Sequence, residues 1–157
     1  GPDGSEVWSA NVQMTAPALV QGGGKIAAYD VGGTAVYVLD ENGEQMELTA
    51  EGPIVSASLN SSGMLAVTSQ ISGTKGRVDV YTADGSALAE VNAHRRFVAD
   101  ACVTEDGKSL SVVLMGQEDG TFVSDVSFYD LTRPGEAEVT ADYVVQDGDM
   151  MNFRFNV

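Results

Sequence analysis

Three tyrosines recur at nearly equal spacing along the 157-residue chain, each inside a short apolar segment that precedes a glycine turn. Tyr37, Tyr81 and Tyr129 lie 44 and 48 residues apart. A sequence that repeats one pattern at about this period encodes a small structural unit several times, and such units stack because none buries its apolar surface alone. This repeat restricts the fold more than any other feature of the sequence.

Glycine turns mark the same period independently. Gly63 and Gly107 occupy the same place in successive units and lie 44 residues apart. The pairs Asn42-Gly43, Asp84-Gly85 and Asp106-Gly107 supply residues that adopt the positive φ angles of tight hairpins. The sequence therefore predicts antiparallel strands joined by short turns, with very low helix content because no long stretch has a 3.6-residue apolar period.

We predict one all-β domain over residues 3–157, a β-propeller-like repeat of four-stranded antiparallel blades, about three and a half in number. The expected units are an outer strand within 3–16, blades over 17–52, 53–93 and 94–145, and an inner strand within 146–157. Residues 1–2 (Gly-Pro) have the form of a scar left by tag removal and are set aside. The predicted strands are Ala18–Val20, Lys25–Asp30, Thr34–Leu39, Met46–Ala50, Ile54–Leu59, Met64–Ser69, Arg77–Tyr81, Ala87–Asn92, Phe97–Thr104, Leu110–Met115, Val123–Asp130 and about Glu136–Val144.

The predicted number of blades does not determine whether the chain forms a closed ring, because propellers usually close with four to eight blades. Three outcomes are consistent with the sequence: a truncated arc, a ring completed by a second chain through its open edge strands, or closure by pairing of the terminal strands. A pair of packed sheets, a β-sandwich, is the structural alternative, which the repeat disfavours.

The Gly4-Ser5-Glu6-Val7-Trp8 spacing and the tyrosine-to-glycine turns resemble the quinoprotein-like and WD-type β-propeller superfamily. They are also similar to propeller ectodomains of bacterial surface proteins of unknown function. The resemblance covers nearly the whole chain through short, degenerate motifs, and it implies a fold more than a function. It also implies an extracellular or cell-surface location in a bacterium, with any anchor outside this sequence.

Charge excludes two classes of partner. The formal net charge is −15, from 23 acidic residues and 8 Lys or Arg. Nucleic-acid binding requires clustered positive charge, and adsorption to an anionic membrane surface requires the same. No apolar run approaches the roughly 20 residues that span a bilayer, so we expect no direct membrane insertion.

The sequence offers little for catalysis. His94 is the single histidine and Cys102 the single cysteine, which we expect to be a small buried apolar residue. No serine lies in a Gly-x-Ser-x-Gly motif. Acidic segments such as residues 40–44, 117–120 and 146–149 are too short for a calcium loop and are interpreted as turns. We therefore predict no catalytic residue, metal or cofactor, although 23 carboxylates leave some pair close in space.

One cluster of basic residues stands out against the acidic background. His94-Arg95-Arg96 connects two predicted blades, and the preceding interstrand loop carries Lys75 and ends at Arg77. In a propeller these two connections emerge on the same rim, so five of the nine basic residues are expected there. Paired arginines suit recognition of carboxylate or phosphate. The competing interpretation is that Lys75, Arg95 and Arg96 only neutralise acidic neighbours such as Asp79, Glu90 and Asp100.

These observations predict a non-catalytic binding or scaffold module of a secreted or surface-anchored bacterial protein. Its partner is expected to be a protein or a small anionic ligand, with pairing to a second copy or another chain as a further option. The alternative function is a fragment of a propeller enzyme, carbohydrate-active or quinone-dependent, whose active site requires further blades.

Overall fold

The computed structural model describes residues 3–43, 45–133 and 143–145, which form twelve β-strands. No helix in this part of the chain is long and apolar enough to cross a membrane. The strands are β1 (Pro17–Gly22), β2 (Lys25–Asp30), β3 (Ala35–Asp40), β4 (Gln45–Thr49), β5 (Ile54–Leu59), β6 (Leu65–Ser69), β7 (Arg77–Tyr81), β8 (Ala87–Asn92), β9 (Phe97–Val103), β10 (Ser109–Glu118), β11 (Thr121–Asp130) and β12 (Tyr143–Val145).

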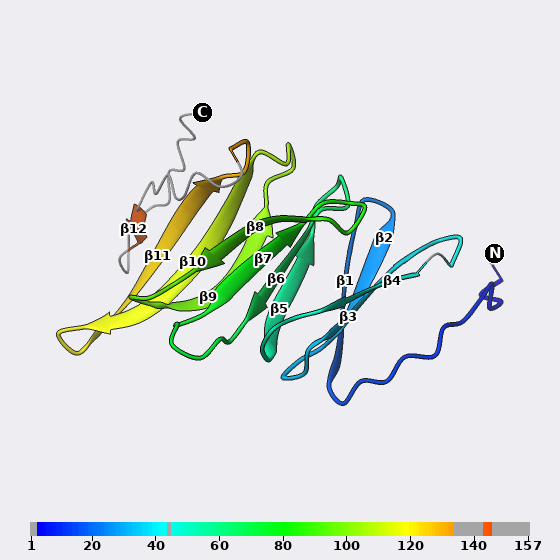
Figure 1. Cartoon of the computed structure of the whole chain (residues 1–157), viewed down its shortest axis with the longest axis horizontal. Helices are drawn as coiled ribbons and strands as arrows, with labels where there is room; N and C mark the ends of the chain where they lie inside the picture. Colours follow the sequence, from blue (N-terminus) through cyan, green and yellow to red (C-terminus); the bar gives the residue numbers. More distant parts are fainter. Residues whose placement is uncertain (1–2, 44, 134–142, 146–157) are drawn as a thin grey trace.

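Each run of four strands forms one antiparallel sheet in which neighbours in sequence are neighbours in space. We call β1–β4 blade 1, β5–β8 blade 2 and β9–β12 blade 3; the described part of β12 is three residues long. Figure 1 shows the three sheets side by side in chain order, as in an open fan. The predicted all-β fold of propeller-like blades is confirmed. Neighbouring strands are antiparallel because the turns that join them are short.

Two apolar cores lie between the blades. Val36 and Val38 of blade 1 and Leu65 of blade 2 are buried in the first core. Val80 of blade 2 and Leu110 of blade 3 are buried in the second. Because side chains along a strand alternate between the two faces of the sheet, each blade packs one row of side chains against each neighbouring blade. Full burial of each such side chain contributes about 1.5–3 kcal/mol, so blade stacking is the main source of stability.

The blades also present two rims. We call the rim with the β2–β3, β6–β7 and β10–β11 loops and the β4–β5 and β8–β9 connections the loop rim, and the opposite one the turn rim. Inner strands of neighbouring blades are joined by polar contacts. The Ser58 hydroxyl donates to the Ala101 carbonyl oxygen over 2.8 Å, and the Asn60 side-chain amide donates to the Thr104 carbonyl oxygen over 3.0 Å. Blades 2 and 3 are thus fixed in register.

The strand predictions hold closely in blade 2, and the largest difference in a predicted blade lies in blade 3. β10 extends as far as Glu118, and β11 begins at Thr121. The sequence predicts a loop in this stretch. Asp119 and Gly120 both have positive φ, +48° and +79°, so they form the two-residue turn of a long hairpin. Tyr37 is also not the structural counterpart of Tyr81. Leu39, two residues later, stands at the same distance before the turn glycine Gly43 as Tyr81 does before Gly85, so Leu39 is the counterpart.

The outer strand expected within residues 3–16 does not form, because this segment pairs with no strand among the described residues. Its tryptophan is held instead by a turn of blade 1: the Trp8 indole N–H donates to the Glu41 carbonyl oxygen over 3.0 Å. The tag scar at 1–2, the inner strand expected within 146–157 and most of the fourth strand of blade 3 fall outside the described residues.

Candidate binding site at the loop rim

Two segments build the loop rim between blades 2 and 3 by hydrogen bonding through their backbones. The Lys75 amide donates to the Ala93 carbonyl oxygen over 2.8 Å, and the Ala93 amide donates to the Gly76 carbonyl oxygen over 2.9 Å. The Val98 amide donates to the Lys75 carbonyl oxygen over 3.1 Å. These bonds hold the β6–β7 loop against the β8–β9 connection, so Lys75 and residues 94–97 share one surface.

Gly76 makes this close approach possible. Its φ is +135°, and a Cβ atom at this position would lie 2.9 Å from the Val98 side chain. An L-residue would meet both backbone strain and a steric clash. The glycine therefore sets the distance between the two basic segments.

The exposed cations of the rim are Lys75 and Arg95. The Lys75 ammonium lies 5.0 Å from the centre of the Phe97 ring, within the range of a cation–π contact. Arg95 and the neighbouring His94 are exposed and make no ion pair with any residue in the described ranges. Phe97 is 59% exposed, so an aromatic face and free positive charge lie together.

Arg96 forms ion pairs with two carboxylates of blade 3. Its guanidinium pairs with Glu118 and with Asp125, and its side chain is only 12% exposed. The aliphatic part crosses Gly116, where a Cβ atom would lie 2.9 Å from the Arg96 Cγ. Arg96 thus shapes the rim while its charge is already neutralised.

Arg77 is even more fully engaged. Its guanidinium contacts Glu51 at 2.7 Å, Asp79 at 3.1 Å and Glu90 at 2.5 Å, and the side chain is 12% exposed. Burial acts to lower the pKa of Arg77, but Asp79, Glu90 and Glu51 together raise it. Burial raises the pKa of Asp79, with Arg77 opposing that shift. Arg77 is a structural ion-pair centre, a role not expected from the sequence.

Two open hollows flank the Lys75–Phe97 contact. One has a volume of about 410 Å³ and the other about 380 Å³, and both are lined by Lys75 and Phe97. The first is completed by Arg95, Arg96, Gly116, Gln117 and Glu118, and the second by Pro53, Gln70, Ile71, Ser72, Thr74 and Gly76. Three of the five predicted basic residues therefore line one hollow.

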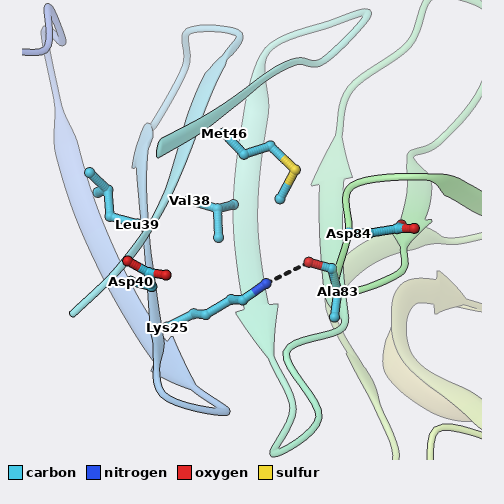
Figure 2. Close-up of a pocket in the computed structure, with 7 residues that line it drawn as sticks. All are labelled: Lys25, Val38, Leu39, Asp40, Met46, Ala83 and Asp84. Atoms are coloured by element: carbon cyan, nitrogen blue, oxygen red, sulfur yellow. Dashed lines mark hydrogen bonds between the residues drawn. The ribbon is translucent and has the colours of Figure 1, made fainter. Parts of the chain in front are cut away.

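A further hollow of about 310 Å³ lies at the turn rim between blades 1 and 2. Figure 2 shows Lys25 reaching across it, where its ammonium donates to the Ala83 carbonyl oxygen over 2.5 Å. Met46 points into the same gap, and a Cβ atom at Gly85 would lie 2.0 Å from its sulfur. Because the Lys25 ammonium is bonded to a backbone carbonyl of blade 2, this contact joins two blades.

The expectation that Cys102 is buried is wrong. Cys102 is exposed, and its sulfur lies 3.1 Å from the Ser111 hydroxyl. β9 alternates, so Ala101 and Val103 face blade 2 while Cys102 faces the opposite side of blade 3. The sequence pattern identified a strand but not which face the rest of the fold covers.

The acidic segments that resembled calcium loops form turns where the structure describes them. The Gly43 amide donates to the Asp40 carbonyl oxygen over 3.1 Å, and the Asn42 amide donates to the Asp40 carboxylate over 2.9 Å. Within the described residues, no three His, Cys, Asp or Glu side chains gather as metal ligands. The segment 146–149 lies outside these residues.

A protein-family model matches residues 1–152 of the chain. It describes the family of unknown function DUF5711. The chain belongs to this family. No curated protein matches this DUF5711 member.

Among solved structures, this DUF5711 member resembles Hsv2p of Kluyveromyces lactis, a WD40 β-propeller of the PROPPIN group. The TM-score is 0.55 at 20% sequence identity. The match covers 78% of this chain and 40% of Hsv2p, so the chain spans less than half the length of that propeller. At this identity the likeness establishes the fold alone.

The predicted basic patch is therefore smaller than expected but better defined. Lys75, Arg95 and Arg96 come together with His94 beside them, whereas Arg77 is occupied by carboxylates. Sequence reasoning missed Phe97, whose exposed ring lies between the two hollows. The only signal for it was its position at the start of a predicted strand, directly after the basic run.

Proposed function

We propose that this chain is a non-catalytic binding module whose loop rim between blades 2 and 3 binds an anionic group. The group belongs to a partner protein or to a small ligand that carries a carboxylate or phosphate. The module is part of a secreted or surface-anchored bacterial protein. This location is supported by the acidic composition and by the resemblance to propeller ectodomains.

One observation carries the proposal: Lys75 and Arg95 are exposed cations beside the same hollow on a chain with a net charge of −15. Unlike Arg77 and Arg96, they are not neutralised by carboxylates of the described residues. A local positive site against a negative background directs an anion to one place. The planar Arg95 guanidinium also matches carboxylate or phosphate geometry.

The hollows and the aromatic ring support the same function. Volumes of about 410 and 380 Å³ fall in the range of small-ligand sites. Phe97 adds an apolar surface beside the cations, as exposed aromatic side chains do at protein interfaces. The backbone bonds of Lys75 hold the loop in place, which lowers the entropic cost of binding.

The alternative, a fragment of a propeller enzyme, has weaker support. Glu51, Asp79 and Glu90 form one group of carboxylates, and all three contact Arg77. Such an arrangement favours an ion-pair network over the proton exchange that a general acid requires. We therefore favour binding over catalysis.

The test is an NMR titration of the ¹⁵N-labelled chain with citrate and with inorganic phosphate at low salt. We expect shifts centred on Lys75, Arg95 and Phe97, with affinity that falls as salt rises because the contact is electrostatic. In Lys75→Ala/Arg95→Ala the affinity falls at least about tenfold, the effect of losing about 1.4 kcal/mol of binding energy.

Lys108→Ala is the matched control, because Lys108 is an exposed lysine on the turn rim. It leaves the affinity unchanged. Equal loss in both variants would indicate a general charge effect, and the absence of any rim shift with either anion would contradict the proposal.

A further inference from the structure

The outer face of blade 3, which points away from blade 2, exposes several apolar side chains, and no strand of another blade among the described residues packs against it. Val113 and Met115 of β10 are 37% and 47% exposed, and Phe122 of β11 is 81% exposed. The register places these three side chains on one face: Val113 is opposite Val126, Met115 opposite Ser124, and Phe122 opposite Gln117. Exposed apolar side chains that gather on one sheet face indicate an interaction surface.

The outer face of blade 1, at the other end of the arc, has the same character. Leu19 of β1 is 64% exposed and Ile26 of β2 is 38% exposed. Leu19 is opposite Ala28, and Ile26 is opposite Gln21 and Leu39, so these residues share the face that points away from blade 2. Figure 2 shows Leu39 and Val38 directed to opposite sides of this blade.

Each end face has a position that corresponds to one buried between blades inside the molecule. The pairing registers place Ile26 where blade 2 has Leu65, which is 2% exposed against blade 1. At the other end, Val113 stands where blade 2 has Thr68, which is 1% exposed. At Val113 the outer face of blade 3 thus corresponds to the surface with which blade 2 receives blade 3. Met115 and Phe122 extend this face along the longer β10–β11 hairpin, which has no counterpart in blade 2.

We propose that the outer face of blade 3 packs against the outer face of blade 1 of a second copy of this chain. The contact continues the blade-to-blade packing already present twice in each copy, and it removes both apolar faces from water. It is a head-to-tail contact between two different surfaces, so two copies close a ring through two identical contacts when the rotation permits. It does not use Lys75 or Arg95, although Met115 is opposite Phe97 in the β9–β10 pairing, so the contact borders the anion site.

The charge of the chain adds a testable feature. Each copy carries −15, so two copies repel each other while the apolar faces attract. Screening weakens the repulsion and leaves the apolar contact intact. The assembly is therefore expected to strengthen as salt rises, opposite to anion binding at the loop rim.

The experiment is light scattering with size-exclusion chromatography on the 157-residue chain over a range of concentrations. We expect a species of at least twice the 16.4 kDa chain mass. Leu19→Lys and Met115→Glu, on opposite end faces, each reduce it to the monomer. Mixing the two variants restores the assembly, because one contact in each mixed pair is then unchanged and the other joins Lys to Glu.

Val7→Lys is the control, since Val7 is 77% exposed in the N-terminal segment and lies on neither end face; it keeps the assembly. Thermal unfolding of each variant confirms that it is folded. A monomeric wild-type chain at all concentrations and salt levels would overturn the proposal. So would an assembly that Met115→Glu disrupts but Leu19→Lys does not, because that result indicates blade 3 packing on blade 3.

Discussion

The Lys75 ammonium lies 5.0 Å from the centre of the Phe97 ring, and this contact joins the loop of one blade to the first strand of the next. Both residues line both hollows of the loop rim. The pair therefore forms the ridge between the two hollows, with positive charge on one side of an aromatic face.

The ridge should contribute measurable coupling energy. In a double-mutant cycle of Lys75→Ala and Phe97→Leu, urea unfolding is expected to give an interaction of about 0.5–1 kcal/mol, the value for an exposed cation–π pair. Leucine keeps apolar surface and removes the ring, so the cycle isolates the aromatic contribution. A coupling energy of zero would show that the two side chains are only near each other.

Gly76 should tolerate replacement poorly, because it combines positive φ with close packing against Val98. Gly76→Ala is expected to lower the free energy of unfolding by about 2–3 kcal/mol, because positive φ and the clash with Val98 act together. Gly73 also has positive φ, +84°, but open space around it. Gly73→Ala should therefore cost only about 1 kcal/mol, the backbone strain alone. Equal losses in urea unfolding would contradict the steric argument.

The sequence was most informative where local signals agreed. In blade 2, alternating apolar residues lie between turns, and the predicted strands Ile54–Leu59, Arg77–Tyr81 and Ala87–Asn92 match the structure in both bounds. It failed at residues 3–16, where a glycine turn and a tryptophan imitate a strand end. Trp8 is placed by a hydrogen bond to a residue 33 positions away, which no local pattern encodes.

The site was predictable only in part, for a related reason. Topology brings Lys75 and Arg95 to one rim, and the repeat revealed that topology. Which cations stay free depends on tertiary contacts: the carboxylates of Arg96 come from β10 and β11, and Glu51 reaches Arg77 from another blade's connection. The exposure of Cys102 likewise depends on blade 3 being the last described blade, a property of the assembled arc.

Arg77 should stabilise the fold strongly at neutral pH. Arg77→Met leaves Glu51, Asp79 and Glu90 without their cation, and breaking a buried pair in this way costs about 3 kcal/mol. Burial already raises the pKa of Asp79 above its usual value of 3.8, so its protonated form is favoured in the folded state as pH falls. The loss should therefore be smaller at pH 4 than at pH 7 in urea unfolding. Arg95→Met, at an exposed position, is expected to change stability by less than about 0.5 kcal/mol.

The carboxylate of Asp84 in the β7–β8 turn should stabilise the fold, and this stabilisation should be lost in acid. Its pKa is shifted in the opposite direction to that of Asp79. The Thr82 hydroxyl and the Ser86 amide lower the pKa of Asp84 from 3.8 to about 2. This carboxylate supports folding above pH 3.8, and that support is lost as pH falls through 2. Thr82→Val should move the pKa of Asp84 back toward 3.8 in a ¹³C carboxyl NMR titration. Thr104→Val, the same change in the turn of Asp106, should leave Asp84 unchanged; a low pKa in both variants would exclude the hydroxyl as the cause.

Cys102 reports directly on the outer face of blade 3. Because the thiol is exposed in the single chain, we expect it to react with Ellman's reagent in the native state within about tenfold of its rate in urea. A second copy packed on this face would cover it, so the native rate should fall as protein concentration rises, and it should recover in Leu19→Lys. A thiol that reacts only after unfolding, even in the monomeric variants, would instead show that another part of the chain covers it. The reaction thus separates a face that is open in the monomer from one that the chain itself buries.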